Sequence, residues 1–569
     1  MHKTSPRYPF WPAALLVPAL LLAACGGADS TAPAVTGPTS ALAGKLYGPT
    51  GAQLTLQVNG GGDRSVTVVP STATPYPYDL TPFTFATPLA DGAPYAVTVK
   101  SAAANQTCQV FKGASGTMPV AAGALRVGCE TTFDLVSRSA DDRTFGTYYD
   151  SYAVAIGGAD VPIGSTTQGY GEGRFIVFTS SAAMAGATGA HRQVFWRDRF
   201  TGEVLLVSAG AAGQEGNGDS ANAAISADGL TVAFESTASN LVSGDTNGVR
   251  DVFVWSAQAV GGSSRAVVRA SVGTGGLQYT AGSGNPTLSG DGRYIAFETL
   301  NSNLNSNVAG SDNITVVVRR DPSSGTTLLL SRNAAGNGVE SSAPSISEDG
   351  RRVAFHSFQP TLVAGDTNGL WDIFVAEVGS GTIQRVSLTA TGGERNQGTE
   401  SASRLVSPAI SGDGRWVAYA TTASNVVAGD TNATQDVFVV DTQTGAVIRA
   451  SVAGNGAQAD ADAPSGQGQR LALSYDGTWV AFSSTAGNLG VATTTTGIGN
   501  VFMHNRSTGE TRALTNNTGS GGITGPVGLS RSAAYAVFGS SERPDSRFAS
   551  SGWFARFTGV APAFFWISN

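Results

Sequence analysis

Three loops of the chain combine oxygen-bearing side chains at spacings that could hold a hard cation. Each reads Gly-Asp-Thr-Asn and is followed by a second Asp four residues after the Asn. The side chains concerned are Asp245, Asn247, Asp251, Asp366, Asn368, Asp372, Asp430, Asn432 and Asp436. Calcium takes about six to eight oxygen ligands, whereas each loop offers three side chains. Calcium is therefore one hypothesis. The short ligand set favours the other, a plain turn whose last Asp accepts hydrogen bonds from nearby backbone N–H groups, with no cofactor required.

Residue types that commonly carry out catalysis form no recognisable pattern. The Gly-x-Ser-x-Gly motif of many hydrolases is absent. His191, His356 and His504 lie far apart in the sequence, which disfavours a zinc site. His356 directly follows Phe355 in an apolar run, so we expect it to pack between elements. Carboxylate pairs that cleave glycosides are defined by distance in space. The sequence therefore leaves catalysis open but favours a role other than an enzyme.

The composition points to short strands joined by tight turns. The 569 residues include 74 Gly and only 13% charged residues, and no long stretch has the apolar periodicity of a helix. The formal net charge is −7. Nucleic acid requires a basic surface, so it is not expected as a partner.

The first residues have the features of a secretory signal. Lys3 and Arg7 precede an apolar run, residues 10–24, and the sequence then reads Leu-Ala-Ala-Cys up to Cys25. This ending resembles the lipobox of bacterial lipoproteins. The resemblance implies a signal peptide over residues 1–24 and a diacylglycerol on Cys25, which would anchor the protein in a membrane. Gly26 in place of Asp implies transfer to the outer membrane. Residues 25–39 are small and polar with two prolines, and they predict a flexible linker.

Residues 40–130 are expected to form a small antiparallel β-sandwich. Segments such as residues 53–58 and 95–99 alternate apolar and polar side chains, and turn residues separate them. The unit resembles the Ig-like or prealbumin-like modules of bacterial surface lipoproteins. Cys108 and Cys129 are the other two cysteines of the chain. In an oxidising compartment they predict a disulfide, since two free thiols or a metal site lack supporting ligands.

From residue 131 to residue 569 the sequence repeats. A turn of the type Ser-x-Asp-Gly precedes an apolar Val-Ala-Phe strand, a segment such as Asp-Val-Phe-Val follows, and a third segment ends in Ser or Thr. Seven copies are counted by the aromatic residue of the first strand: Phe178, Phe234, Phe297, Phe355, Tyr419, Phe482 and Phe538. A strand that is apolar on consecutive positions must be covered on both faces. We therefore predict an all-β fold with a seven-bladed β-propeller after the sandwich, with six or eight blades as alternatives.

Two segments compete to close the ring. Residues 133–137 match the last strand of a blade and precede the first copy, whereas residues 565–568 fit the same position at the other end of the chain. We expect the N-terminal segment to complete the C-terminal blade.

The Ser-x-Asp-Gly-x-x-Val-Ala-Phe pattern with Asp-Val-Phe-Val after it resembles the TolB-like propeller repeats, also called WD40-like. That family has six blades and a different N-terminal domain. The resemblance implies a monomeric cell-envelope platform, periplasmic or surface-exposed, that binds a protein or peptide. The alternative is a hydrolase or lyase that acts on a carbohydrate or peptide at the propeller channel.

Overall fold

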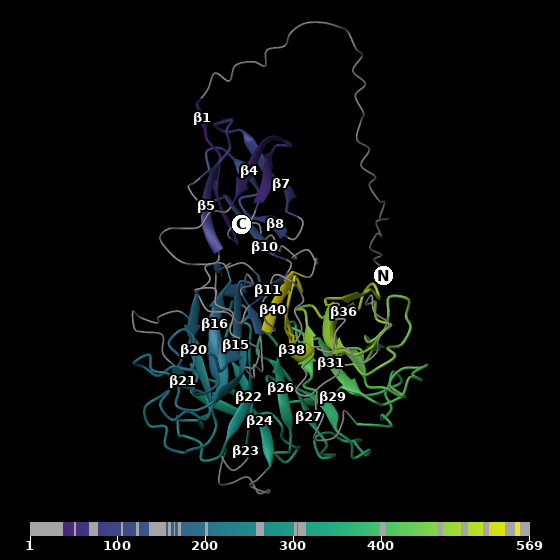
Figure 1. Cartoon of the computed structure of the whole chain (residues 1–569). Helices are drawn as coiled ribbons and strands as arrows, with labels where there is room; N and C mark the ends of the chain where they lie inside the picture. The colour runs from purple at the N-terminus through teal and green to yellow at the C-terminus, as the bar shows by residue number, and fades with distance from the viewer. Residues whose placement is uncertain are drawn as a thin grey trace, which may run out of the picture.

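The computed structural model describes most of the sandwich and of the repeat region as strands (Figure 1). The described residues are 38–49, 53–67, 78–103, 106–120, 125–131, 133–135, 155–157, 161–163, 166–168, 172–199, 203–257, 267–300, 304, 314–398, 406–463, 470–490, 499–515, 523–540 and 552–557. Cys25, the signal peptide and residues 565–568 lie outside them. Within these ranges no helix is long and apolar enough to cross a membrane.

The N-terminal unit consists of two four-stranded sheets packed face to face and a two-stranded sheet formed by its first and sixth strands. Its strands are β1 (Thr39–Ser40), β2 (Ala43–Pro49), β3 (Gln53–Val58), β4 (Gly61–Thr67), β5 (Tyr78–Thr84), β6 (Leu89–Ala90), β7 (Pro94–Ala102), β8 (Gln106–Lys112), β9 (Ser115–Thr117) and β10 (Leu125–Thr131). The sheet orders are β5-β2-β10-β8 and β4-β3-β7-β9, with β2 and β10 parallel. Leu46 and Val127 from one sheet and Leu56 and Val97 from the other bury one shared core.

The repeat region forms seven four-stranded sheets within the described residues, as expected for seven blades. Blade 1 comprises β12 (Ala155–Gly157), β15 (Phe175–Ser180), β16 (Gln193–Asp198) and β17 (Val204–Leu206), and a separate hairpin pairs β13 (Val161–Ile163) with β14 (Thr166–Gln168). Blade 2 comprises β18 (Ser220–Ile225), β19 (Thr231–Ser236), β20 (Asp251–Ser256) and β21 (Val267–Arg269). Blade 3 comprises β22 (Ser283–Leu288), β23 (Ile295–Leu300), β24 (Thr315–Asp321) and β25 (Thr326–Leu329).

The remaining four blades follow the same order. Blade 4 comprises β26 (Ser342–Ile346), β27 (Arg352–Ser357), β28 (Asp372–Glu377) and β29 (Ile383–Arg385). Blade 5 comprises β30 (Ala409–Ile410), β31 (Trp416–Thr421), β32 (Asp436–Asp441) and β33 (Val447–Arg449). Blade 6 comprises β34 (Ala472–Leu473), β35 (Trp479–Ser484), β36 (Asn500–Asn505) and β37 (Thr511–Ala513). Blade 7 comprises β38 (Ile523–Leu529), β39 (Tyr535–Ser540), β40 (Gly552–Phe557) and β11 (Phe133–Leu135).

The blades close into a ring. The first strand of each blade contacts the first strand of the next, and β38 of blade 7 contacts β12 of blade 1. These first strands therefore surround the channel. The ring is fastened by β11, which precedes blade 1 in the chain yet pairs with β40 through Phe133–Arg556, Asp134–Ala555 and Leu135–Phe554. The N-terminal segment thus supplies the outer strand of blade 7.

The repeat aromatics pack within each blade. In five blades the aromatic of the second strand stacks on the aromatic of the third strand, for example Phe234 on Phe253 with ring centres 5.7 Å apart. The other four pairs are Phe178–Phe195, Phe355–Phe374, Tyr419–Phe438 and Phe482–Phe502. This pairing explains why Val-Ala-Phe and Asp-Val-Phe-Val recur together in the sequence.

The turn glycines are required by the neighbouring blade as well as by backbone conformation. Gly477 has φ +64°, which favours glycine, and the Trp416 ring of the preceding blade lies on its Cα, so that an added Cβ would lie 2.4 Å from ring atoms. The same aromatic-on-glycine contact recurs at Phe175–Gly229, Tyr294–Gly350 and Tyr535–Gly173. The last of these joins blade 7 to blade 1.

Candidate functional site

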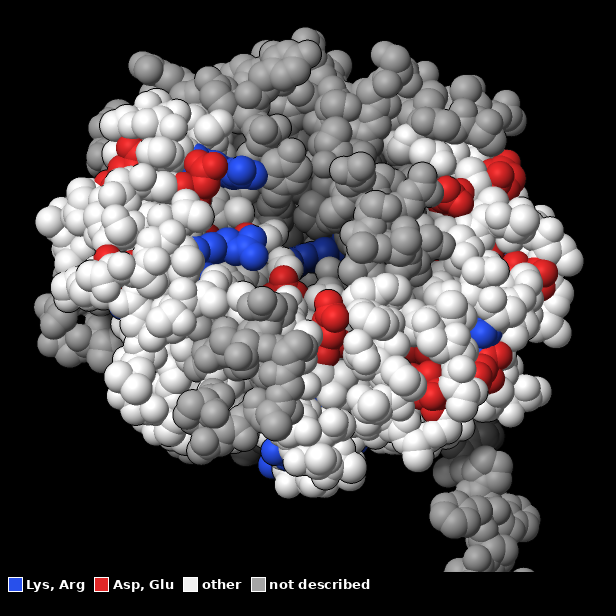
Figure 2. All heavy atoms as spheres, turned by 90° about the horizontal axis from the view of Figure 1, so that it is seen from below, with Lys and Arg blue, Asp and Glu red and all other residues white. Residues whose placement is uncertain are grey.

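The two ends of the channel differ, and we name them by their backbone features. The turn side carries the Ser-x-Asp-Gly turns between the first and second strands of the blades. The bulge side carries the start of the first strands, where β18, β22 and β26 contain bulges. Because β11 follows β10 directly and blade 7 is antiparallel throughout, β38 runs toward the sandwich. The turn side therefore faces the sandwich, and Figure 2 views the bulge side.

The Ser and Asp side chains of the Ser-x-Asp-Gly turns stabilise these turns by hydrogen bonds. In blade 2, the Ser226 hydroxyl donates to Asp228 at 2.5 Å, and the same serine oxygen accepts the N–H of Thr231 at 2.9 Å. Backbone hydrogen bonds then link the x residue of one turn to that of the next, as in Gly290 N–H to Glu348 O at 2.8 Å and Glu348 N–H to Gly412 O at 2.9 Å. The x side chains are thereby placed around the turn-side end of the channel.

On the turn side, side chains from opposite blades meet across the channel. Glu348 belongs to blade 4 and Arg531 to blade 7, and Arg531 Nε lies 3.4 Å from Glu348 Oε2. The Arg531 guanidinium also stacks over the Tyr475 ring of blade 6, 4.0 Å from its centre. Gly412 leaves room for this contact, since a Cβ there would lie 2.4 Å from Tyr475. We call Glu348, Tyr475 and Arg531 the turn-side cluster.

Glu348 is the titratable group of this cluster with the largest perturbation. Burial raises its pKa from 4.5 to about 7, against the opposing charge of Arg531, and the nearby Glu172 carboxylate adds to the rise. Glu172 itself accepts hydrogen bonds from the N–H and hydroxyl of Ser532, both at 2.6 Å. A carboxyl group with a pKa near neutrality, beside a second carboxylate, is able to exchange protons.

On the bulge side, two glutamates tie each blade to the bulge of the next. Glu235 accepts the N–H of Asn285 at 2.8 Å, and Glu298 accepts the N–H of Ala343 at 3.1 Å. Asn285 and Ala343 adopt left-handed backbone conformations with φ 49° and 53°, which turn their N–H groups toward these acceptors. Arg250 donates to the other oxygen of Glu235 at 3.2 Å.

Arg470 lies on the opposite wall of this end, at the start of the first strand of blade 6. Its backbone forms a bridge with Ser407 of blade 5. Within the described part of the chain its guanidinium makes no hydrogen bond and no ion pair. Burial lowers the pKa of Arg470, and the charges of Glu235 and Glu298 oppose this. We call Glu235, Arg250, Asn285, Glu298 and Arg470 the bulge-side cluster. Figure 2 shows the centre of this face hollowed, with basic and acidic side chains around the hollow.

In each of the three Asp-Thr-Asn loops, an arginine side chain lies among the oxygen atoms that the sequence offered as calcium ligands. In blade 5, Arg449 Nη1 lies 3.0 Å from Asp430 and 3.2 Å from Asp436, and Nη2 donates to the Gly429 carbonyl at 3.4 Å. Asn432 donates to Asp436 at 3.0 Å.

The other two loops repeat this arrangement. Arg269 lies 3.3 Å from Asp245 and 3.4 Å from Asp251, and Arg385 lies 2.7 Å from Asp366 and 3.6 Å from Asp372. Asn247 and Asn368 donate to Asp251 and Asp372, respectively. The structure thus brings all nine predicted residues together in three groups, each around an internal guanidinium. No group of three His, Cys, Asp or Glu side chains suited to a metal occurs in the described residues.

The last Asp of each loop also fixes the serine that ends the repeat. Ser451 donates to Asp436 at 2.5 Å, and its oxygen accepts the N–H of Val437 at 3.0 Å. Ser271 and Ser387 do the same in blades 2 and 4. These aspartates are therefore fully engaged in holding the third and fourth strands together.

The two cysteines of the sandwich and His356, which were also considered from the sequence, have structural roles. Cys108 and Cys129 form a disulfide between the paired strands β8 and β10. His356 is buried and donates through Nε2 to the Val406 carbonyl at 2.9 Å, and burial lowers its pKa to about 4. It therefore joins blade 4 to blade 5 as a neutral imidazole.

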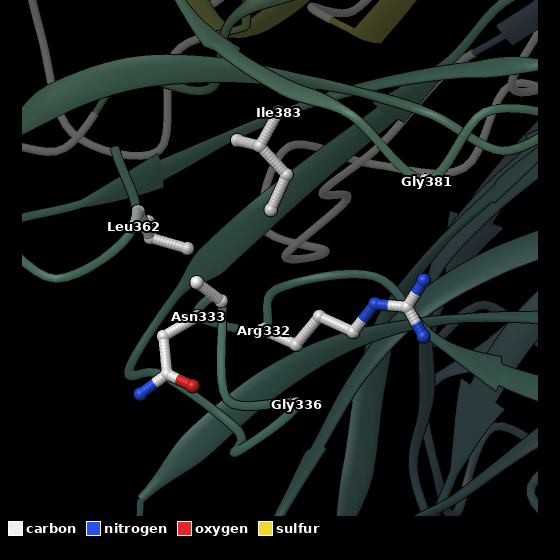
Figure 3. A pocket seen from close by; sticks show the side chains of 7 residues that line it. Arg332, Asn333, Gly336, Leu362, Gly381 and Ile383 are labelled. Atoms are coloured by element: carbon white, nitrogen blue, oxygen red, sulfur yellow. The ribbon is translucent and has the colours of Figure 1, made fainter. Parts of the chain in front are cut away.

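A further depression of about 330 Å³ lies at the rim of blades 3 and 4. Its lining includes Arg332, Asn333, Leu362, Gly381 and Ile383 (Figure 3). It presents a single guanidinium beside apolar groups and gathers no titratable cluster, so we place the candidate site in the channel.

Comparison with solved structures finds other β-propellers at low similarity. TolB from Acinetobacter baumannii is 14% identical, with a TM-score of 0.30, over 56% of this chain and 61% of that protein. Oligogalacturonate lyase from Vibrio parahaemolyticus is 10% identical, with a TM-score of 0.43, over 74% of this chain and 96% of that protein. The β-propeller domain of the Trilobed protease from Pyrococcus furiosus is 9% identical, with a TM-score of 0.33, over 57% and 80%.

These matches are too distant to assign a role, and the chain spans 61% of the length of the first TolB. No family model matches the sequence. No curated protein matches it either.

Proposed function

We propose that this protein is a cell-envelope platform whose propeller binds a protein or peptide at the bulge-side hollow. One observation carries the proposal: the acids of the bulge-side cluster accept hydrogen bonds from their own wall, whereas Arg470 has no acceptor among the described residues. Glu235 and Glu298 accept backbone N–H groups of the next blade, so they stabilise the ring. Arg250 is half exposed, and Arg470 makes no hydrogen bond within the described residues. Such an arrangement suits recognition more than acid–base chemistry.

Site-specific photo-crosslinking in cells tests this proposal. A photoreactive residue replaces Asn222, which lies in the bulge of blade 2 and donates to Asn285 at 3.0 Å. The matched control replaces Leu277, a rim residue that is 77% exposed. We expect a discrete crosslinked partner from position 222 and not from position 277. Identical products from the two positions, or none from position 222, would refute binding at the hollow.

We also propose that Cys25 carries the lipid and that residues 25–39 link it to the sandwich, with the protein held at the outer membrane as a monomer. The support is the lipobox-like ending of the signal region. Metabolic labelling with an alkyne fatty acid should mark the full chain and fail to mark Cys25→Ser. Equal labelling of both proteins would exclude this anchor.

A hydrolase or lyase that acts on a carbohydrate or peptide is the second candidate. It is favoured by Glu348, whose pKa is raised to about 7, together with the adjacent Tyr475 and Arg531. If this cluster is catalytic, Glu348→Gln should abolish release of products from envelope polysaccharide or peptide fractions, with Glu510→Gln, a surface acid of blade 6 that is 45% exposed, as the control. An absence of products from wild-type protein would leave only the binding function.

A further inference from the structure

Blades that lie opposite each other in a ring of seven can be linked only through the channel. Blades 4 and 7 are so placed, and the Glu348–Arg531 contact of 3.4 Å joins them on the turn side. Tyr475 of blade 6 packs on the same guanidinium. Side chains therefore cross this end of the channel, which favours entry of a ligand from the bulge side.

At the bulge side, the described residues form no such link between opposite walls. Arg470 of blade 6 faces Glu235 and Glu298 of blades 2 and 3, and no ion pair within 4.0 Å joins them in the described structure. Both glutamates are occupied on their own wall. Glu298 accepts from the side chain of Asn285 and from the N–H of Ala343.

Among the described residues, the Arg470 side chain therefore has hydrogen-bond donors without acceptors. A guanidinium carries five N–H donors in a planar fork that matches a carboxylate. Those of Arg470 have no acceptor among the described residues, and burial weakens their contact with water. An arginine held in this state is suited to receive an anionic group.

We propose that the bulge-side hollow binds the C-terminal carboxylate of a peptide chain, with Arg470 as its anchor. A channel crossed by side chains at its far end admits the end of a peptide chain more readily than its middle, and the Arg470 guanidinium, which has no acceptor among the described residues, matches the charge of that end. This inference rests on the proposed binding function and names the group that the site recognises.

The test uses two pools of fluorescein-labelled, sequence-randomised hexapeptides, one with free C-terminal carboxylates and one amidated. Fluorescence anisotropy with the full chain should give at least about tenfold tighter binding of the free-acid pool, because one charged hydrogen-bonded pair is worth about that factor. Arg470→Gln should remove the preference, and Arg470→Lys should restore part of it. Arg351→Gln is the control, since Arg351 is 75% exposed and belongs to the turn of blade 4, on the side away from the bulges.

Thermal unfolding of each variant without peptide establishes that it is folded. Equal binding of the two pools, binding of neither pool, or a preference that survives in Arg470→Gln would each overturn the inference. If photo-crosslinking at position 222 still captures a partner in those cases, the binding function stands and only the carboxylate anchor is refuted.

Discussion

The contact between Trp416 and Gly477 provides a quantitative test of how the blades specify one another. In Gly477→Ala, the new side chain requires a left-handed backbone at φ +64° and places Cβ 2.4 Å from the Trp416 ring. The backbone conformation costs about 1–2 kcal/mol and overpacking about 1–3 kcal/mol. We therefore expect the free energy of unfolding to fall by about 2–5 kcal/mol.

Gly456→Ala is the matched control. Gly456 has φ +83° with no atom within 4 Å of an added Cβ, so this variant should lose only the backbone contribution, about 1–2 kcal/mol. Urea unfolding of the full chain, followed by tryptophan fluorescence, measures both losses. In a Trp416→Ala background, the cost of Gly477→Ala should fall to that of Gly456→Ala. Equal losses for the two alanine variants in the wild-type background would refute the steric argument.

Five further outcomes are expected. Because the pKa of Glu348 is raised from 4.5 to about 7, the folded state binds more protons than the unfolded state between these values, so stability falls as pH rises through this window. Glu348→Gln should remove that fall, which at about 1.4 kcal/mol per pKa unit reaches about 3 kcal/mol in urea titrations at pH 5 and pH 8. Arg449→Met should cost about 3–5 kcal/mol by leaving buried carboxylates without their cation. A chelator should leave the melting temperature unchanged, and a lower value would instead support calcium. Deletion of residues 131–139 should abolish cooperative unfolding of the propeller in calorimetry, and an unchanged transition would show that β11 is dispensable. Removal of the Cys108–Cys129 disulfide, whose cysteines are 21 positions apart in sequence, should destabilise the sandwich by about 3 kcal/mol in reducing versus oxidising urea titrations.

The repeat pattern was sufficient to predict the strands because every blade has to bury both of its faces against its neighbours and therefore needs the same residue types at the same positions. Phe234 and Phe253 recur as a pair since two stacked aromatics fill the blade, and Asp-Gly recurs because the turn and the adjacent blade both require glycine. Residues 133–137 are the segment expected from the sequence to close the ring, and β11, over Phe133–Leu135, occupies that position.

We did not predict from the sequence that arginines occupy the Asp-Thr-Asn loops, although their position in the repeat is regular. Arg269, Arg385 and Arg449 each stand two residues before the repeat serine, and they occur in the three repeats that carry these loops. A search for calcium ligands considers only oxygen atoms, so it does not identify a guanidinium of the chain as the cation of these loops.

The channel clusters could not be derived from spacing along the chain. Glu348 and Arg531 are far apart in sequence and meet only because blades 4 and 7 stand opposite each other in a closed ring. Their position in the repeated turn does predict that they face the channel, but it does not predict which of them make contact.

The closing strand β11 also has a mechanical consequence. The sandwich is joined to the propeller through β10 and β11, so any pull on the N-terminal part of the chain loads the β11–β40 ladder. Because β11 runs away from the sandwich, this pull acts along the strand and strains the pairs at Phe133, Asp134 and Leu135 together, in shear, instead of opening them one at a time. The strand that completes the ring is thus the element through which tension on an anchored chain reaches the blades.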